Sequence, residues 1–215
     1  MRGLLLAGAL LALAPALPAP AQIAAPTAES PGDPAARPFI EKLIGDGFAT
    51  LRDKSLSKSA ARARFRALLK DNVALNDIGD RLIRRQRAAG QVSPAQYQAY
   101  QAALPEFILS AYADRLNDYS DASVKTLRTV GRGPYTEVYT RVTRPGAGPV
   151  DTIWQVKRNA AGALVVNNLI VANINLALTQ EADFASYVAK NGFDALVAFM
   201  TSANAKQIAA NRNVK

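Results

Sequence analysis

The sequence predicts an α+β fold with N-terminal helices, a four-stranded curved antiparallel sheet and C-terminal helices. Three observations lead to this prediction. Apolar residues recur at helical spacing up to about residue 119 and then alternate with polar residues from about residue 123. The links between the alternating segments are short and rich in glycine and proline, which favours antiparallel hairpins. Helical spacing then returns at the end of the chain, so helices and strands are segregated along the sequence.

The N-terminus has the features of a secretory signal peptide. Arg2 supplies a positive start, an apolar run extends from Leu4 to Leu17, and small residues lead up to Ala21. The run is shorter than the roughly 20 residues that a membrane span needs. We therefore expect residues 1–21 to be cleaved and the protein to be exported to the periplasm. The next segment, residues 22–37, is rich in alanine and proline and is expected to form a flexible lead-in.

Residues 38–210 suit one domain of moderate size, which begins with three helices. The first helix starts at Pro38 and the second near Ser57 or Ser59. The third ends at Gly90, because glycine commonly stops a helix. Their apolar faces contain Ile40, Leu43, Ile44, Phe48, Leu51, Phe65, Leu68, Leu69, Leu75, Ile78, Leu82 and Ile83.

A fourth, longer helix is predicted from Ser93 to about Tyr119. Ser93-Pro94-Ala95-Gln96 has the form of a capping box, with proline in the first turn. Pro105 lies inside the apolar pattern and is expected to kink or split the helix.

The period changes from 3.6 to 2 after this helix, and four strands follow. Two closing helices are then expected over residues 180–190 and 194–209, with Asn191-Gly192 as the stop between them. The predicted strands cover residues 124–131, 135–144, 150–158 and 163–174.

The sequence offers little for catalysis. It contains no histidine and no cysteine, which removes the commonest general base, thiolate nucleophiles and the usual zinc ligands. Gly131-Arg132-Gly133 precedes a strand instead of a helix, so it lacks the context of a nucleotide-binding loop. Asp114 and Asp118 lie on one face of the predicted helix. A solvent-exposed face accounts for this pair of carboxylates without a catalytic role. We expect no cofactor, no metal and no enzymatic activity.

The net charge is +9, and the predicted signal peptide accounts for only one of these charges. A basic surface favours anionic partners, and for an exported protein these are membrane headgroups and not nucleic acid. The alternative is that the basic residues serve only solubility.

The two faces of the second predicted strand differ in polarity. Tyr135, Glu137, Tyr139 and Arg141 alternate along it and share one face. That face is either a solvent-exposed side of the sheet or a polar catalytic wall, and exposure is the commoner case.

The opposite face is apolar and is expected to lie under the helices. Periodicity alone does not distinguish a solid core from a cavity at this place. If a cavity is present, we expect its wall to combine inward residues of the sheet with residues of the long helix: Val138, Val142, Trp154, Val156, Phe107, Ile108 and Leu116.

Five segments, in this order, resemble the MlaC family of periplasmic phospholipid-binding proteins, also called the toluene-tolerance family. They are Phe65-Arg66-Ala67-Leu68-Leu69, then Asp77-Ile78, then the tyrosine-rich helix, then Trp154–Asn159, and then Val166–Leu176. Phe184, Gly192, Asp194 and Leu196 follow where the family has a helix phenylalanine and a G-x-D-x-L segment.

The resemblance extends over about residues 37 to 202 and implies a fold similar to nuclear-transport-factor-like domains, with lipid tails in a deep apolar pocket. It further implies a carrier that moves phospholipid, or a related acyl lipid, between the two membranes and so serves outer-membrane lipid asymmetry. The implied partners are an outer-membrane lipoprotein–porin complex and an inner-membrane complex of an MCE-domain protein with an ABC transporter.

Two other classes of function remain open. An enzyme on the same cone-shaped fold would need polar groups that converge inside the pocket. A periplasmic chaperone would expose an open cleft instead of a closed pocket.

Overall fold

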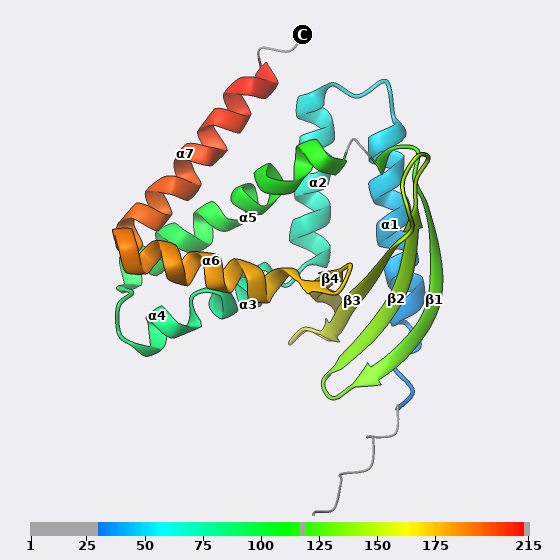
Figure 1. The fold of residues 1–215 in the computed structure, drawn as a ribbon, viewed down its shortest axis with the longest axis horizontal. Coiled ribbons are helices and arrows are strands. Elements are labelled where there is room, and N and C mark those ends of the chain that lie inside the picture. Colours follow the sequence, from blue (N-terminus) through cyan, green and yellow to red (C-terminus); the bar gives the residue numbers. More distant parts are fainter. Residues whose placement is uncertain (1–29, 117–118, 213–215) are drawn as a thin grey trace, which may run out of the picture.

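The structure is a computed structural model that describes residues 30–116 and 119–212 (Figure 1). The predicted signal peptide and the first half of the predicted lead-in, residues 22–29, lie outside the described residues. Within the described part of the chain, no helix is long and apolar enough to cross a membrane.

The N-terminal part forms four helices where the sequence predicts three. Ser57 caps the second helix as expected, because its hydroxyl oxygen accepts a hydrogen bond from the amide of Ala60 at 3.2 Å. The predicted third helix is interrupted at Ile83, whose φ and ψ of −119° and 18° are not helical. The four helices are α1 (Ala36–Arg52), α2 (Lys58–Asn72), α3 (Leu75–Leu82) and α4 (Arg84–Ala88).

The long helix, α5 (Pro94–Leu116), begins at the predicted capping box. The Ser93 amide donates to Oε1 of Gln96 at 2.9 Å, and the Gln96 amide donates back to Oγ of Ser93 at 3.3 Å. Pro105 lies inside α5 without splitting it, so of the predicted kink or split the split does not occur.

A five-stranded antiparallel sheet follows, in the order β1-β2-β3-β4-β5. The α+β prediction is confirmed, but the sheet has one strand more than predicted. Ala172 and Asn173 have positive φ values of 49° and 66°, which turn the chain and end the predicted fourth strand early. The strands are β1 (Ser123–Arg132), β2 (Tyr135–Thr143), β3 (Val150–Arg158), β4 (Leu164–Val171) and β5 (Ile174–Asn175).

Two helices close the chain, α6 (Leu176–Asn191) and α7 (Phe193–Arg212). Asn175 caps α6 by accepting a hydrogen bond from the amide of Leu178 at 3.1 Å, so this helix begins four residues before the prediction. Gly192 separates the two helices with a φ of 84°, as the Asn-Gly signal predicts.

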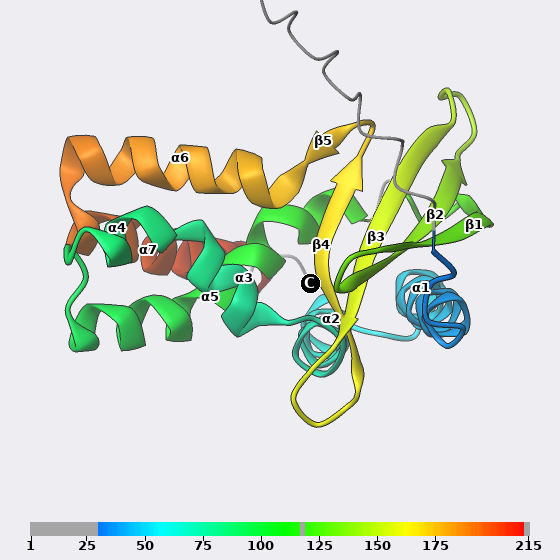
Figure 2. The ribbon, with the colours of Figure 1, turned by 90° about the horizontal axis from the view of Figure 1, so that it is seen from below.

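The elements form two packed regions, with α2 between them (Figures 1 and 2). In the first, α1 lies against the sheet. We call its buried side chains the α1 core: Ala36, Ile40, Val138, Val156 and Val166. In the second, α3 to α7 pack together. We call its buried side chains the helical core: Leu82, Ile83, Tyr100, Leu104, Phe184, Phe193, Leu196 and Met200.

Candidate functional site

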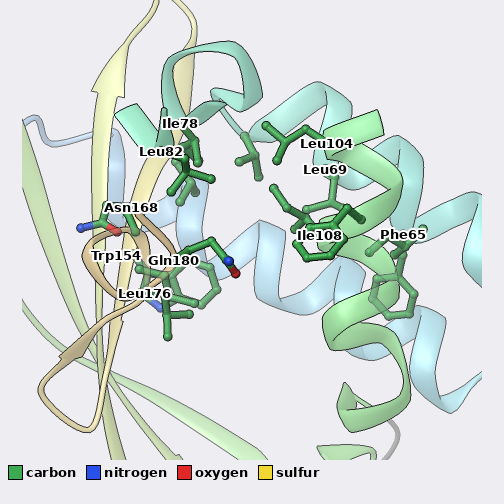
Figure 3. Close-up of a pocket in the computed structure, with 16 residues that line it drawn as sticks. Phe65, Leu69, Ile78, Leu82, Leu104, Ile108, Trp154, Asn168, Leu176 and Gln180 are labelled. Carbon is green, nitrogen blue, oxygen red and sulfur yellow. The ribbon is translucent and has the colours of Figure 1, made fainter. Parts of the chain in front are cut away.

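An apolar cavity of about 320 Å³ lies between the two cores (Figure 3). Its wall includes Val166 of the α1 core and Leu82 and Leu104 of the helical core, so neither core fills the space between them. Further apolar side chains of α2, α3 and α5 are Phe65, Leu69, Ile78, Phe107, Ile108 and Leu109. The sheet and the start of α6 contribute Trp154, Leu169, Leu176 and Ala177.

The periodicity of the helices and of the strands places these side chains around one space. Phe65 and Leu69 are four residues apart on α2 and therefore lie on one face of that helix. Trp154 of β3 and Leu169 of β4 are partners in the antiparallel register, so both point to the same side of the sheet. The cavity is thus bounded by one face of the sheet and by side chains of α2, α3, α5 and α6.

Two polar side chains border the cavity among the described residues, Asn168 and Gln180. The Asn168 amide nitrogen donates to Gln155 at 3.0 Å and to Asn175 at 3.1 Å, and Figure 3 shows this amide turned away from the cavity. The amide of Gln180 reaches toward the middle of the cavity in the same view. Both amides are uncharged, so this wall suits hydrocarbon far better than an ion.

The predicted wall residues divide into three groups. Phe107, Ile108 and Trp154 line the cavity, as predicted. Val138 and Val156 do not: they are 0% and 1% exposed in the α1 core, and their placement in the wall was wrong. The reason is that α1 lies directly on this part of the sheet and fills the space over it.

The last two predicted residues lie toward the ends of their elements. Val142 is half-buried and pairs with Val124 and Val150, and it is not part of the cavity wall. Leu116 is the last residue of α5, and its side chain lies outside the described residues.

Several wall residues were missed by the sequence prediction. The pairs Phe65 and Leu69 on α2 and Ile78 and Leu82 on α3 carried a visible signal, since each pair has a spacing of four residues. Leu176 had no such signal, because α6 begins earlier than its apolar pattern indicates.

A charged cluster lies where α2 contacts α5, beside the cavity. Arg62 and Arg66 of α2 both pair with Glu106 of α5. The side chain of Arg62 is only 10% exposed, and its Nη2 also donates to Oγ of Ser110 at 2.7 Å. Burial alone would raise the pKa of Glu106, but hydrogen bonds from Arg66 and Arg62 bring this pKa below its ordinary value of 4.5.

The polar face of β2 is more buried than the sequence predicts. Arg141 is exposed, but Glu137 is only 8% exposed. The Tyr139 hydroxyl donates to Glu137 at 2.8 Å, and the Gln155 amide donates to the same carboxylate at 2.9 Å. Burial, and then the bond to Glu137, raise the pKa of Tyr139. None of these polar side chains belongs to the described cavity wall, so they do not form a catalytic group inside it.

Comparison with known proteins bears on what this cavity holds. The protein-family model described as MlaC protein matches residues 41–202 of this chain. The chain belongs to the MlaC family. A search of curated proteins finds no match. Among solved structures, this MlaC-family chain resembles a phospholipid-binding protein from Ralstonia solanacearum that was determined in complex with a phospholipid.

That likeness has a TM-score of 0.67 at 19% sequence identity and covers 80% of this chain and 98% of the other. At this identity it establishes a shared fold. Together with the family match, it confirms the MlaC-like α+β architecture predicted from the sequence.

Proposed function

We propose that this protein is a phospholipid carrier whose apolar cavity shelters acyl chains. The observation that carries the proposal is the cavity itself: about 320 Å³, walled by apolar side chains from both cores. This volume is within the range of ligand-binding pockets. The MlaC family match and the phospholipid bound by the Ralstonia solanacearum protein of the same fold support this ligand class.

The energetics of lipid transfer explain what such a cavity contributes. A diacyl lipid that leaves a bilayer exposes about 30 methylene groups, and at about 0.8 kcal/mol each this costs on the order of 24 kcal/mol. A protein wall of similar apolarity offsets much of this cost. Loading and unloading can then be nearly balanced, so transfer needs no catalytic side chain in the carrier. This fits a binding protein better than an enzyme.

The cellular setting belongs to the same proposal. The predicted signal peptide supports export to the periplasm, where the carrier would move lipid between the membranes. The MlaC resemblance supports exchange with an outer-membrane lipoprotein–porin complex and with an inner-membrane MCE-domain and ABC-transporter complex. Intact mass and fractionation of the protein from its host test the export step. A product that keeps residues 1–21, or that remains in the cytoplasm, would contradict it.

Mass spectrometry of an organic extract from the purified protein tests the ligand directly. We expect phospholipid in near-stoichiometric amount, and the same protein stripped of lipid and refolded should take up phospholipid again from vesicles. Protein that contains no lipid and takes up none would overturn the proposal. Copurified peptides in place of lipid would indicate a chaperone, and chemically altered lipid would indicate an enzyme.

A further inference from the structure

Arg62 is an unusual residue for a helix that walls an apolar cavity. Its Nε donates to Oε1 of Glu106 at 2.8 Å and its Nη2 donates to Ser110 at 2.7 Å. Its remaining nitrogen, Nη1, is buried and finds no acceptor in the described structure. A buried donor on a charged group is unfavourable without an acceptor, and such groups rarely stay unpaired.

The cluster around Arg62 also has an excess of positive charge. Two guanidinium groups, of Arg62 and Arg66, share the single carboxylate of Glu106. The lowered pKa of Glu106 keeps that carboxylate ionised at neutral pH. Among the described members of the cluster, one positive charge is therefore left without a counter-ion.

The position of the cluster relates this charge to the cavity. Phe65, a wall residue, lies between Arg62 and Arg66 along α2. On α5, Glu106 directly precedes the wall residue Phe107. The cluster thus lies at the edge of the apolar wall. Arg62 is its buried member, and Arg66, with 47% of its side chain exposed, extends to solvent.

We propose that Arg62, supported by Arg66, binds the phosphate group of a lipid whose acyl chains occupy the cavity. The polarity changes in the order that a phospholipid requires, from apolar wall to buried guanidinium to exposed guanidinium. Phosphate oxygens are strong acceptors and match the planar donor array of arginine, so Nη1 gains its missing partner. This inference rests on the proposed function and identifies the side chains that hold the phosphate ester of the lipid.

The test compares three probes that separate the phosphate from the chains. They are phosphatidylglycerol, diacylglycerol with the same chains, and glycerol phosphate without chains. We expect lipid-stripped protein to bind phosphatidylglycerol about tenfold more tightly than diacylglycerol, equivalent to about 1.4 kcal/mol. Glycerol phosphate alone should bind weakly, since it lacks the chains.

Arg62→Gln should abolish this preference and leave the affinity for diacylglycerol unchanged. Arg64→Gln is the matched control, because Arg64 lies on the same helix, is 54% exposed and pairs with Asp53 away from the cluster. The control should keep the full preference. If Arg62→Gln does not fold, Glu106→Gln tests the same inference. It removes the carboxylate that pairs with both arginines and so frees them for the phosphate, and the preference for phosphatidylglycerol should increase.

The outcomes separate this inference from the proposed function. Equal affinity for the two lipids in the wild-type protein would overturn the role of Arg62 while leaving a lipid carrier in place. Binding of neither lipid would overturn the proposed function itself. Tight binding of glycerol phosphate would overturn the lipid as the source of the phosphate. An unchanged or weaker preference in Glu106→Gln would also contradict the role of Arg62.

Discussion

Val138 and Trp154 are cross-strand partners on one face of the sheet, yet they belong to regions of different character. Val138 is fully buried in the α1 core, where Ile40 of α1 packs on the same cluster. Trp154 borders the cavity, where the opposing residues on α2 and α5 leave space unfilled. The same alternation of apolar residues therefore supports a solid core under one helix and a cavity under others. Which helix covers the strand, and not the polarity of the strand, decides between the two.

Removing equal side chains from the two regions should have unequal effects on stability. Ile40→Ala leaves a cavity in a packed core and should lower the free energy of unfolding by about 2–5 kcal/mol. Ile108→Ala removes a side chain that already borders open space, so the same truncation should cost clearly less. Urea denaturation of the lipid-free proteins measures both values. Equal losses would mean that the cavity wall is packed as tightly as the α1 core.

Enlarging a side chain should also destabilise the α1 core more than the cavity wall. Val138→Trp overpacks the α1 core and should destabilise the fold by about 1–3 kcal/mol or prevent folding. Ile108→Trp projects into the cavity and should leave the melting temperature nearly unchanged while it displaces copurified lipid. Thermal melting together with mass spectrometry of extracts records both effects. A destabilised Ile108→Trp that still carries lipid would show that Ile108 is a core residue and that the lipid lies elsewhere.

Local signals in the sequence predicted the elements well. The Ser93 capping box located the start of α5, and β1 to β3 lie within about one residue of their predicted bounds. The start of α6 was predicted late because Asn175 caps it shortly after a turn with positive φ at Ala172 and Asn173. Asparagine adopts that conformation more readily than most residues, but alanine gives no signal for it.

The site was harder to predict, for a physical reason. Trp154, Phe107 and Ile108 were identified because periodicity shows which face of an element is apolar. Val138 and Val156 have the same periodicity but pack under α1, and the spacing between a helix and a sheet is set by contacts far apart in the sequence. Arg62 illustrates the same limit: on the sequence it is one of many basic residues, and only the contact with α5 buries it.

The smallest expected difference between the two regions is in how their ion pairs respond to acid. Glu106 at the cavity edge has a lowered pKa, so its contribution to stability is complete above the ordinary carboxyl pKa of 4.5 and is lost as the pH falls through its lower folded value. Glu41 on α1 pairs with Arg37, but both side chains are about half exposed, and such surface pairs contribute little. Glu106→Gln should therefore cost on the order of 1 kcal/mol at pH 7, and this cost should shrink steadily below pH 4.5. Glu41→Gln should show almost no cost at any pH. Urea midpoints of the wild type and the two variants between pH 7 and pH 3 test this prediction. A cost for Glu106→Gln that stays constant with pH would mean that the Glu106 carboxylate contributes by packing and not by charge.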